Sequence, residues 1–295
     1  MANLKEVRNR IASVQSTQQI TKAMKMVSAA KLKRATNAII ALRPYATKLK
    51  EILENLSASL EGSSSPFIQE REPNKVLIVT VSSNRGLAGA FNMNVIKAAN
   101  NLIAEKYSKQ LQNGNVSIIS IGKKTQDFYE KRKYNVIGNN NEIFSALTFE
   151  NVTKITDAIM AGFEKGEFDR VEVVYNRFRN AAIQYITTEQ LLPLQKAEEP
   201  TKTEVKSTNV DYILEPSKEE IVEQLIPKSI KIQLYKAVLD SHASEHGARM
   251  TSMDKATENA GELLKALKLS YNQARQAAIT TELTEIVSGA AALNG

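Results

Sequence analysis

The sequence predicts a long antiparallel coiled coil, formed by helices at the two ends of the chain, with an α/β domain between them. Three observations support this fold class. The final 68 residues, 228–295, contain no proline and place small or apolar residues at helical spacing. Near the other end, apolar residues recur at alternating steps of three and four. In between, β-branched runs of strand length alternate with helical segments.

The composition limits the class of protein. The chain has 295 residues, 42% of them hydrophobic, which is enough to build a core, and it has no cysteine. Disulfides, thiol catalysis and thiolate metal sites are therefore excluded. No stretch is apolar enough to span a membrane, and residues 1–10 alternate charged and apolar side chains, so we expect neither a membrane helix nor secretion.

The positive charge is concentrated at the N-terminus. The net charge is +7, but residues 1–50 hold eleven lysines and arginines against the single acid Glu6, which leaves a net −3 for the remainder. A basic helix suits an acidic protein surface, nucleic acid or anionic lipid, and the plain alternative is a solvated helix face.

The first helix is expected to begin near Ala2 or Asn3 and to end near Gly62, with a kink but no break at Pro44. The polar run 15–19 weakens the apolar stripe and suits a partner other than the coil mate. The predicted apolar positions are Leu4, Val7, Ile11, Val14, Ile20, Met24 and Val27, followed by the heptad set Leu32, Ala35, Ile39, Leu42, Ala46, Leu49, Leu53, Leu56 and Leu60.

The C-terminal helix is too long to lie inside a globule, at about 100 Å for its proline-free part, so it must pair with the first helix. Pro227 either ends a short first segment or kinks the helix. Beyond Arg275 the sequence is apolar with few charges, and an antiparallel pair leaves roughly 20 Å of it unpaired, which requires a sheath. The predicted seam is Met253, Ala256, Ala260, Leu263, Leu267, Ser270, Ala274 and Ala277.

The central region predicts a Rossmann-like α/β domain with a mostly parallel sheet. We expect strands at 76–81, 116–121, 135–137 and 170–178, helices at 93–107, 125–132 and 152–165, and an antiparallel strand at 182–192. A mobile loop at 195–209 and a short strand at 210–214 follow. The predicted domains are therefore an N-terminal helix at 1–61, an α/β domain at 75–215 and a C-terminal helix at 217–293.

Two stretches are candidate chemical sites. Ser83–Asn92 follows a strand and precedes a helix, where nucleotide-binding folds hold phosphate, but it lacks both glycine fingerprints, so a tight turn is favoured. His242 and His246, in an H-x-x-E-H pattern, have the spacing of an inverted zinc-peptidase motif, yet a long exposed helix offers no cavity or third ligand. Solvent-facing or interface histidines are favoured, and we expect no catalytic residue, metal or cofactor.

Three stretches resemble one family. Residues 11–14 and 21–31, then 271–291, and in the middle Arg85-Gly86-Leu87 with Gly89 and Asn92, closely resemble the γ subunit of F-type ATP synthases of the bacterial type. The resemblance covers essentially the whole chain.

The resemblance implies a non-catalytic central-stalk rotor. In that family the coiled coil turns inside a hexamer of α and β subunits, and the α/β domain joins the ε subunit and the c-ring, at the cytoplasmic face of the bacterial membrane. Such a chain associates with the membrane through its partners only and binds no nucleic acid. By motif, the residues implied to contact the β subunit are Met24, Lys25, Arg249, Gln276, Thr280 and Glu282.

Two other functions remain open from the residues alone. A basic coiled-coil protein that binds nucleic acid would also explain the charged N-terminal segment. An enzyme that uses the α/β domain is the third interpretation.

Overall fold

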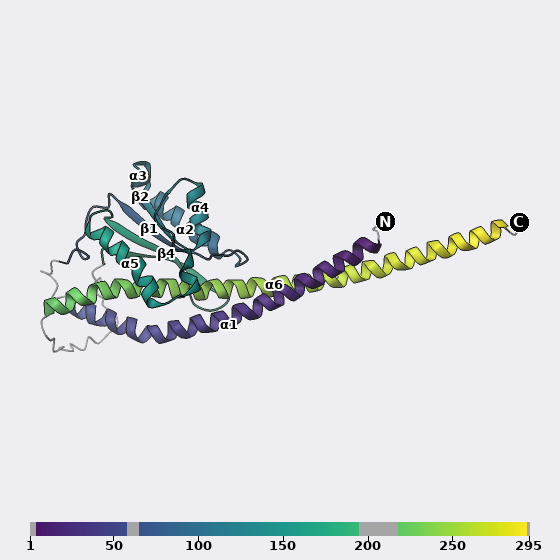
Figure 1. The fold of residues 1–295 in the computed structure, drawn as a ribbon, viewed down its shortest axis with the longest axis horizontal. Helices are drawn as coiled ribbons and strands as arrows, with labels where there is room; N and C mark the ends of the chain where they lie inside the picture. Colours follow the sequence, from purple (N-terminus) through teal and green to yellow (C-terminus); the bar gives the residue numbers. More distant parts are fainter. Residues whose placement is uncertain (1–3, 58–64, 195–217, 294–295) are drawn as a thin grey trace, which may run out of the picture. The chain divides into compact units, whose positions relative to one another are not determined.

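The computed structural model describes residues 4–57, 65–194 and 218–293 (Figure 1). The chain divides into two compact units. One combines residues 1–29 with 249–295, and the other is the continuous stretch 30–248. The predicted strand at 210–214 and the predicted end of the first helix lie outside the described residues.

Two helices account for most of the chain's helical length. Helix α1 spans Leu4–Ser57, 54 residues, and helix α6 spans Lys218–Leu293, 76 residues. Both run without interruption through an internal proline, Pro44 in α1 and Pro227 in α6. The expected absence of a break at Pro44 is confirmed, and at Pro227 the helix does not end.

The two helices pack antiparallel in each unit. In the first unit, Arg8 of α1 hydrogen-bonds Tyr271 of α6, while Gln18, further along α1, reaches back to residue 257. In the second unit, Ala35 and Ile39 of α1 form a buried cluster with Leu239 and Ala243 of α6. This pairing confirms the predicted coiled coil, and small residues on both helices allow their close approach.

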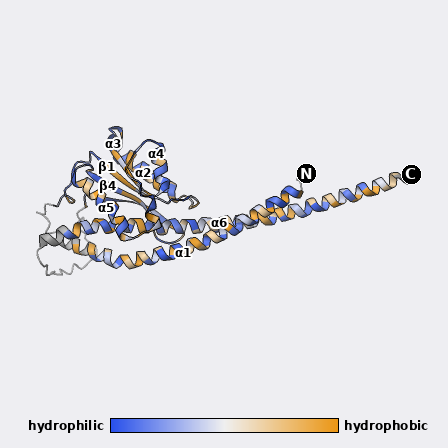
Figure 2. Ribbon diagram, viewed as in Figure 1, coloured by the Kyte–Doolittle hydropathy of each residue, from blue (hydrophilic) through white to orange (hydrophobic). Residues whose placement is uncertain are grey.

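A five-stranded sheet forms the centre of the second unit. Its strands are β1 (Val76–Val81), β2 (Val116–Ile121), β3 (Asn135–Val136), β4 (Arg170–Phe178) and β5 (Gln184–Leu192), in the order β3-β2-β1-β4-β5. Strands β1 to β4 are parallel, and β5 pairs antiparallel with β4. The predicted mostly parallel sheet is confirmed, and its central strands are strongly hydrophobic (Figure 2).

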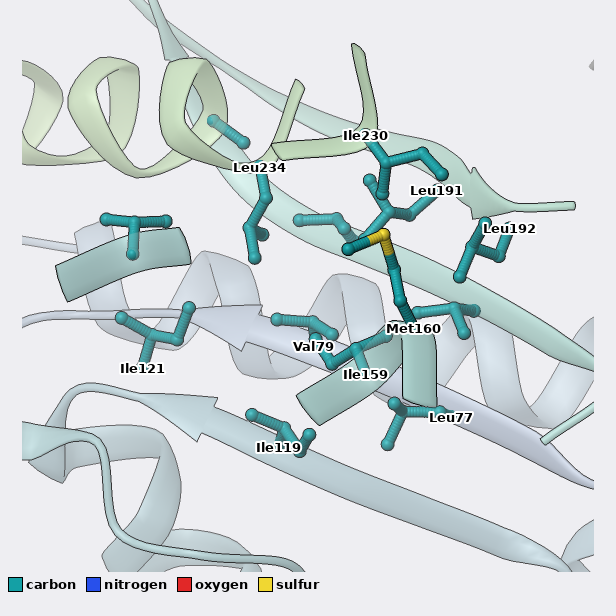
Figure 3. Close-up of a cluster of buried hydrophobic side chains, with 14 of the residues drawn as sticks. Leu77, Val79, Ile119, Ile121, Ile159, Met160, Leu191, Leu192, Ile230 and Leu234 are labelled. Carbon is teal, nitrogen blue, oxygen red and sulfur yellow. The ribbon is translucent and has the colours of Figure 1, made fainter. Parts of the chain in front are cut away.

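Helices cover both faces of the sheet, so the unit has three layers. Helices α2 (Phe91–Lys106) and α4 (Lys123–Lys131) cover one face, and the core between them and the sheet includes Val76, Ile78 and Tyr129. Helix α5 (Phe149–Glu164) and part of α6 cover the other face, where Val79, Ile159 and Leu234 meet (Figure 3). Alternate residues of β1 thus serve opposite cores, which explains its continuous apolar sequence.

The short elements show the limits of sequence pattern. Helix α3 (Ser108–Gln112) and a 3-10 helix at Asn141–Ser145 were not predicted. Each is a single turn or little more, too short to display a helical period. Gly122, directly after β2, adopts φ +117°, and a Cβ built there would lie 2.2 Å from the Ser82 carbonyl oxygen, so only glycine fits.

Candidate functional site

The carboxyl edge of the sheet is the usual position of a ligand site in this kind of fold. In doubly wound folds, ligands bind outside the carboxyl ends of the strands where the strand order reverses, which here is between β1 and β4. Helix α6 occupies that edge. The Ser241 hydroxyl donates to the Val81 carbonyl at 3.4 Å, and the Ser244 hydroxyl donates to the Asn176 carbonyl at 3.0 Å. Both serines are buried, so the chain's own helix fills the position of a nucleotide.

The strand-to-helix loop uses its polar groups internally. The Ser83 amide donates to the Asn92 carboxamide oxygen at 2.9 Å, and the Asn84 carboxamide nitrogen donates to the Asn141 carbonyl at 2.6 Å. Leu87 and Gly89 both have left-handed φ values, 65° and 58°. These contacts are those of a tight turn, the interpretation that the sequence favoured over phosphate binding.

The two histidines are not solvent-facing, which corrects that part of the sequence interpretation. His246 is buried, and its ring meets His242 edge to face with centroids 4.5 Å apart. The His242 ring stacks on Phe144 at 5.5 Å. Burial lowers the pKa of His242 to about 4, with Lys31 adding to the effect. Within the described residues, no cluster of three metal-ligating side chains forms.

The expected exposure of the two histidines was wrong for a physical reason. A long helix with a modest apolar stripe predicts exposure, but the segment 237–247 of α6 is buried on nearly all sides, by the α/β domain on one side and by α1 on another. Gly247 lies so close to the β4–β5 turn that an added Cβ would be 3.1 Å from Ala181. Contact with a distant part of the chain leaves no periodic signal in the helix sequence itself.

The helix pair of the first unit has a polar centre. The Thr257 hydroxyl of α6 lies 2.8 Å from the Thr21 hydroxyl of α1, and Gln18 donates to the Thr257 carbonyl at 3.5 Å. One α1 turn further along, the Lys25 ammonium forms an ion pair with Asp254. The polar run that was expected to meet a foreign partner thus contacts the coil mate through Gln18.

Several seam positions differ from the prediction. Ile20 and Val27 are 60% and 58% exposed, because Thr21 and Ser28 face the partner helix in their place. On α6, Leu263 is 44% exposed, while the next residue, Leu264, is half-buried. A strict heptad count drifts against the 3.6-residue helical turn, and apolar residues at the wrong phase then point outward.

The outward apolar residues make two surfaces in the first unit. The outer α1 surface comprises Ile20, Met26 and Val27, all more than half exposed. The α6 tip is the stretch from Gln276 to Leu293, a helix of 18 residues or about 27 Å that extends beyond the described start of α1 at Leu4. Its exposed apolar side chains are Ile279, Leu283, Ile286 and Val287.

The α6 tip is less polar than its sequence suggests. The Thr280 hydroxyl donates to the Gln276 carbonyl at 2.9 Å, and the Thr284 hydroxyl donates to the Thr280 carbonyl at 2.8 Å. A hydroxyl that donates to a carbonyl of its own helix does not need water to accept its hydrogen bond. Gln276, Thr280, Leu283 and Val287 also follow helical spacing, so they share one face.

The six residues implied to contact a β subunit all lie in the first unit, in three different environments. Met24 and Lys25 are half-buried, and Lys25 is paired with Asp254. Arg249 is buried, with 7% of its surface exposed. The exposed members are Gln276, Thr280 and Glu282.

The fold therefore defines a coiled-coil protein that carries an α/β domain and exposes apolar side chains at one end of its coil. Comparisons with known proteins narrow this class. A family profile described as ATP synthase matches residues 3–293. The ATP synthase gamma chain of Cytophaga hutchinsonii is 57% identical over 295 residues, and that of Flavobacterium johnsoniae is 58% identical over 296 residues. Both alignments cover 100% of each chain. The chain belongs to the ATP synthase gamma chain family.

Solved structures share the fold. A chain of the Euglena gracilis mitochondrial ATP synthase, in an OSCP/F1/c-ring structure, matches with a TM-score of 0.68 and 23% identity, covering 98% of this chain and 94% of that one. A central stalk/c-ring structure from Tetrahymena thermophila matches with a TM-score of 0.57 and 24% identity, covering 80% and 99%. Among the described helices of the present chain, none is long and apolar enough to cross a membrane.

Proposed function

We propose that this chain is the rotating central shaft of a bacterial F-type ATP synthase, a non-catalytic subunit that couples ion flow through a membrane ring to ATP synthesis or hydrolysis in the head. Family membership supports this role, and the observation that carries it is the α6 tip. Four apolar side chains there are between 49% and 67% exposed on an unpaired helix. Burying them would contribute on the order of 4–6 kcal/mol, which favours a sheath around the tip.

On this proposal the sheath is the α and β hexamer. Met24, Lys25, Arg249, Gln276, Thr280 and Glu282 are the proposed β contacts, and the outer α1 surface extends the contact region. The α/β domain would join ε and the c-ring, at the cytoplasmic face of the membrane. Because the shaft makes no bond itself, it would act by presenting different surfaces to each β subunit as it turns, which is coupling through a rigid element.

The nucleic-acid alternative is not favoured. The basic N-terminal segment that suggested it contains Lys25, whose charge is paired within the chain. The family match over residues 3–293 includes this basic segment, so an acidic partner protein in that family's complex would account for its charge without nucleic acid.

The absence of cysteine allows a clean test. A Thr280→Cys variant carries the only thiol in the chain. We expect a maleimide to label it rapidly in the isolated chain and at least about tenfold more slowly in a complex purified with α and β subunits, because the sheath would exclude the reagent. Met93→Cys is the matched control, since Met93 is 49% exposed on helix α2. Equal labelling of Thr280→Cys before and after assembly would refute the sheath.

A further inference from the structure

A basic cavity lies within the second unit. Its volume is about 630 Å³, and α1, the end of β4 with the following turn, and α6 all line it. Small-molecule sites typically have volumes of about 300–1,000 Å³. The charged or aromatic side chains that line it are Arg43, Arg177, Arg179, Lys236, Asp240, Phe178 and Tyr185.

The cations outnumber the acids around this cavity. Four positive groups line the cavity with one carboxylate. Among the described residues, none of the ion pairs within 4 Å involves Arg43, Arg177 or Lys236. Arg179 is held in place, since it donates to the Tyr185 hydroxyl and its guanidinium lies 5.9 Å from the ring centroid. Like charges gathered from three separate elements repel one another, and a bound anion would remove that repulsion.

Asp240 offsets only part of the positive charge around the cavity. It is 4% exposed, and it faces Lys236 on its own helix, Arg43 on α1, Arg177 on β4 and Glu189 on β5. Burial raises the pKa of Asp240 to about 6, although the three cations act in the opposite direction. The Glu189 carboxylate accepts a hydrogen bond from Tyr175 at 2.8 Å, so one of its oxygens is already engaged.

We propose that this cavity binds a small phosphate-bearing anion. Planar guanidinium groups hold phosphate oxygens through paired hydrogen bonds, and three arginines converge here, from α1, from β4 and from the turn after β4. Ile39, Leu42 and Leu239 line the same cavity, so a ligand with an apolar or aromatic body beside its phosphates fits better than free phosphate. Such a ligand would bridge α1, β4 and α6 and would stabilise the second unit.

The test measures binding to the full-length chain by titration calorimetry, with pyrophosphate and magnesium-free ATP as probes. We expect saturable binding of both, tighter for ATP because its base meets the apolar wall. Arg177→Gln should weaken both by about tenfold or more, since a charge-assisted contact is lost. Arg34→Gln removes the same charge from an exposed α1 position outside the cavity and should change binding by less than about twofold.

Sulfate is the probe for the effect of Asp240, because sulfate stays a dianion between about pH 5.5 and 7.5. Any change in its binding over that range therefore comes from the protein and not from protonation of the ligand. Sulfate binding should be several-fold tighter at about pH 5.5 than at about pH 7.5, because Asp240 is protonated at the lower pH, and Asp240→Asn should remove this difference. The absence of saturable binding of pyrophosphate and ATP, or equal losses in Arg177→Gln and Arg34→Gln, would overturn the proposal. Circular dichroism of each variant distinguishes lost binding from lost folding.

Discussion

Replacing Asp240 by Asn should stabilise the second unit at neutral pH. The side chain is 4% exposed, and burial raises its pKa from 3.8 to about 6. Because the folded pKa lies above the unfolded pKa, the folded chain binds the proton more tightly, and ionisation removes stability as the pH rises from about 4 to about 6. A shift of this size corresponds to about 3 kcal/mol. Asp240 borders a cavity that water enters, so we expect about 2 kcal/mol.

Urea denaturation followed by circular dichroism measures this effect. In phosphate-free buffer at about pH 7.5, the free energy of unfolding of Asp240→Asn should be about 2 kcal/mol larger than that of the parent chain. This difference should shrink toward about pH 4.5. Glu105→Gln, on an exposed position of α2, is the control and should show no such trend. If the stability difference for Asp240→Asn were the same at both pH values, the reasoning from burial would be refuted.

His242 should show the opposite dependence. Its folded pKa, about 4, lies below the ordinary 6.5, so the unfolded chain binds the proton more tightly and stability falls as the pH drops through this window. The two groups therefore oppose each other between about pH 4 and 6. We expect the parent chain to show a shallow pH dependence there, and His242→Phe, which keeps an aromatic ring against Phe144, to gain stability relative to the parent at low pH.

Three further changes test the structure. Gly122→Ala should destabilise the second unit by about 3 kcal/mol or more, measured by urea unfolding, because its φ is +117° and the new Cβ would lie 2.2 Å from a backbone oxygen. Ser244→Ala should cost about 1 kcal/mol by the same method, since a buried carbonyl loses its donor. A double-mutant cycle on Lys25 and Asp254 should give a coupling energy of no more than about 1 kcal/mol that falls with salt, because both side chains are near half exposed.

Each of these changes has a matched control or a contrary outcome. Gly86→Ala adds a Cβ with nothing within 4 Å and should be close to neutral. Thr281→Ala removes a hydroxyl bonded at an exposed helical site and should cost less than about 0.5 kcal/mol. A salt-independent coupling between Lys25 and Asp254 would show that their contact is not mainly electrostatic.

Local pattern was enough to predict the main elements of the fold. The six residues of β1 are all buried, as its unbroken apolar run indicates, and the antiparallel β5 followed from the short connection after β4. The helix pair followed from the length of α6 and the apolar spacing of α1. These features depend on residues that are near one another in sequence, so the pattern of one sequence is enough to predict them.

Features that depend on contacts between distant segments were predicted poorly. Ile20 satisfies a helical stripe, but Thr21 makes the contact with α6 because its hydroxyl reaches Thr257. The placement of α6 over the sheet edge, with Ser241 and Ser244 on strand carbonyls, has no local signature either. The basic cavity brings together Arg43 and Arg177, which are separated in the sequence by most of the α/β domain. The assignment of β contacts stays a prediction, because it depends on a partner surface.

The seating of α6 on the carboxyl edge of the sheet has a consequence for biosynthesis. The core of the second unit needs Ile230 and Leu234 as well as β1, which emerges from the ribosome about 150 residues earlier. At about 5–20 residues per second, that interval leaves an incomplete apolar face exposed for some 8–30 s. Contacts of such long sequence separation also slow folding itself. The nascent chain is therefore expected to need a chaperone during this interval, when apolar strands have been made but the helix that closes the sheet has not.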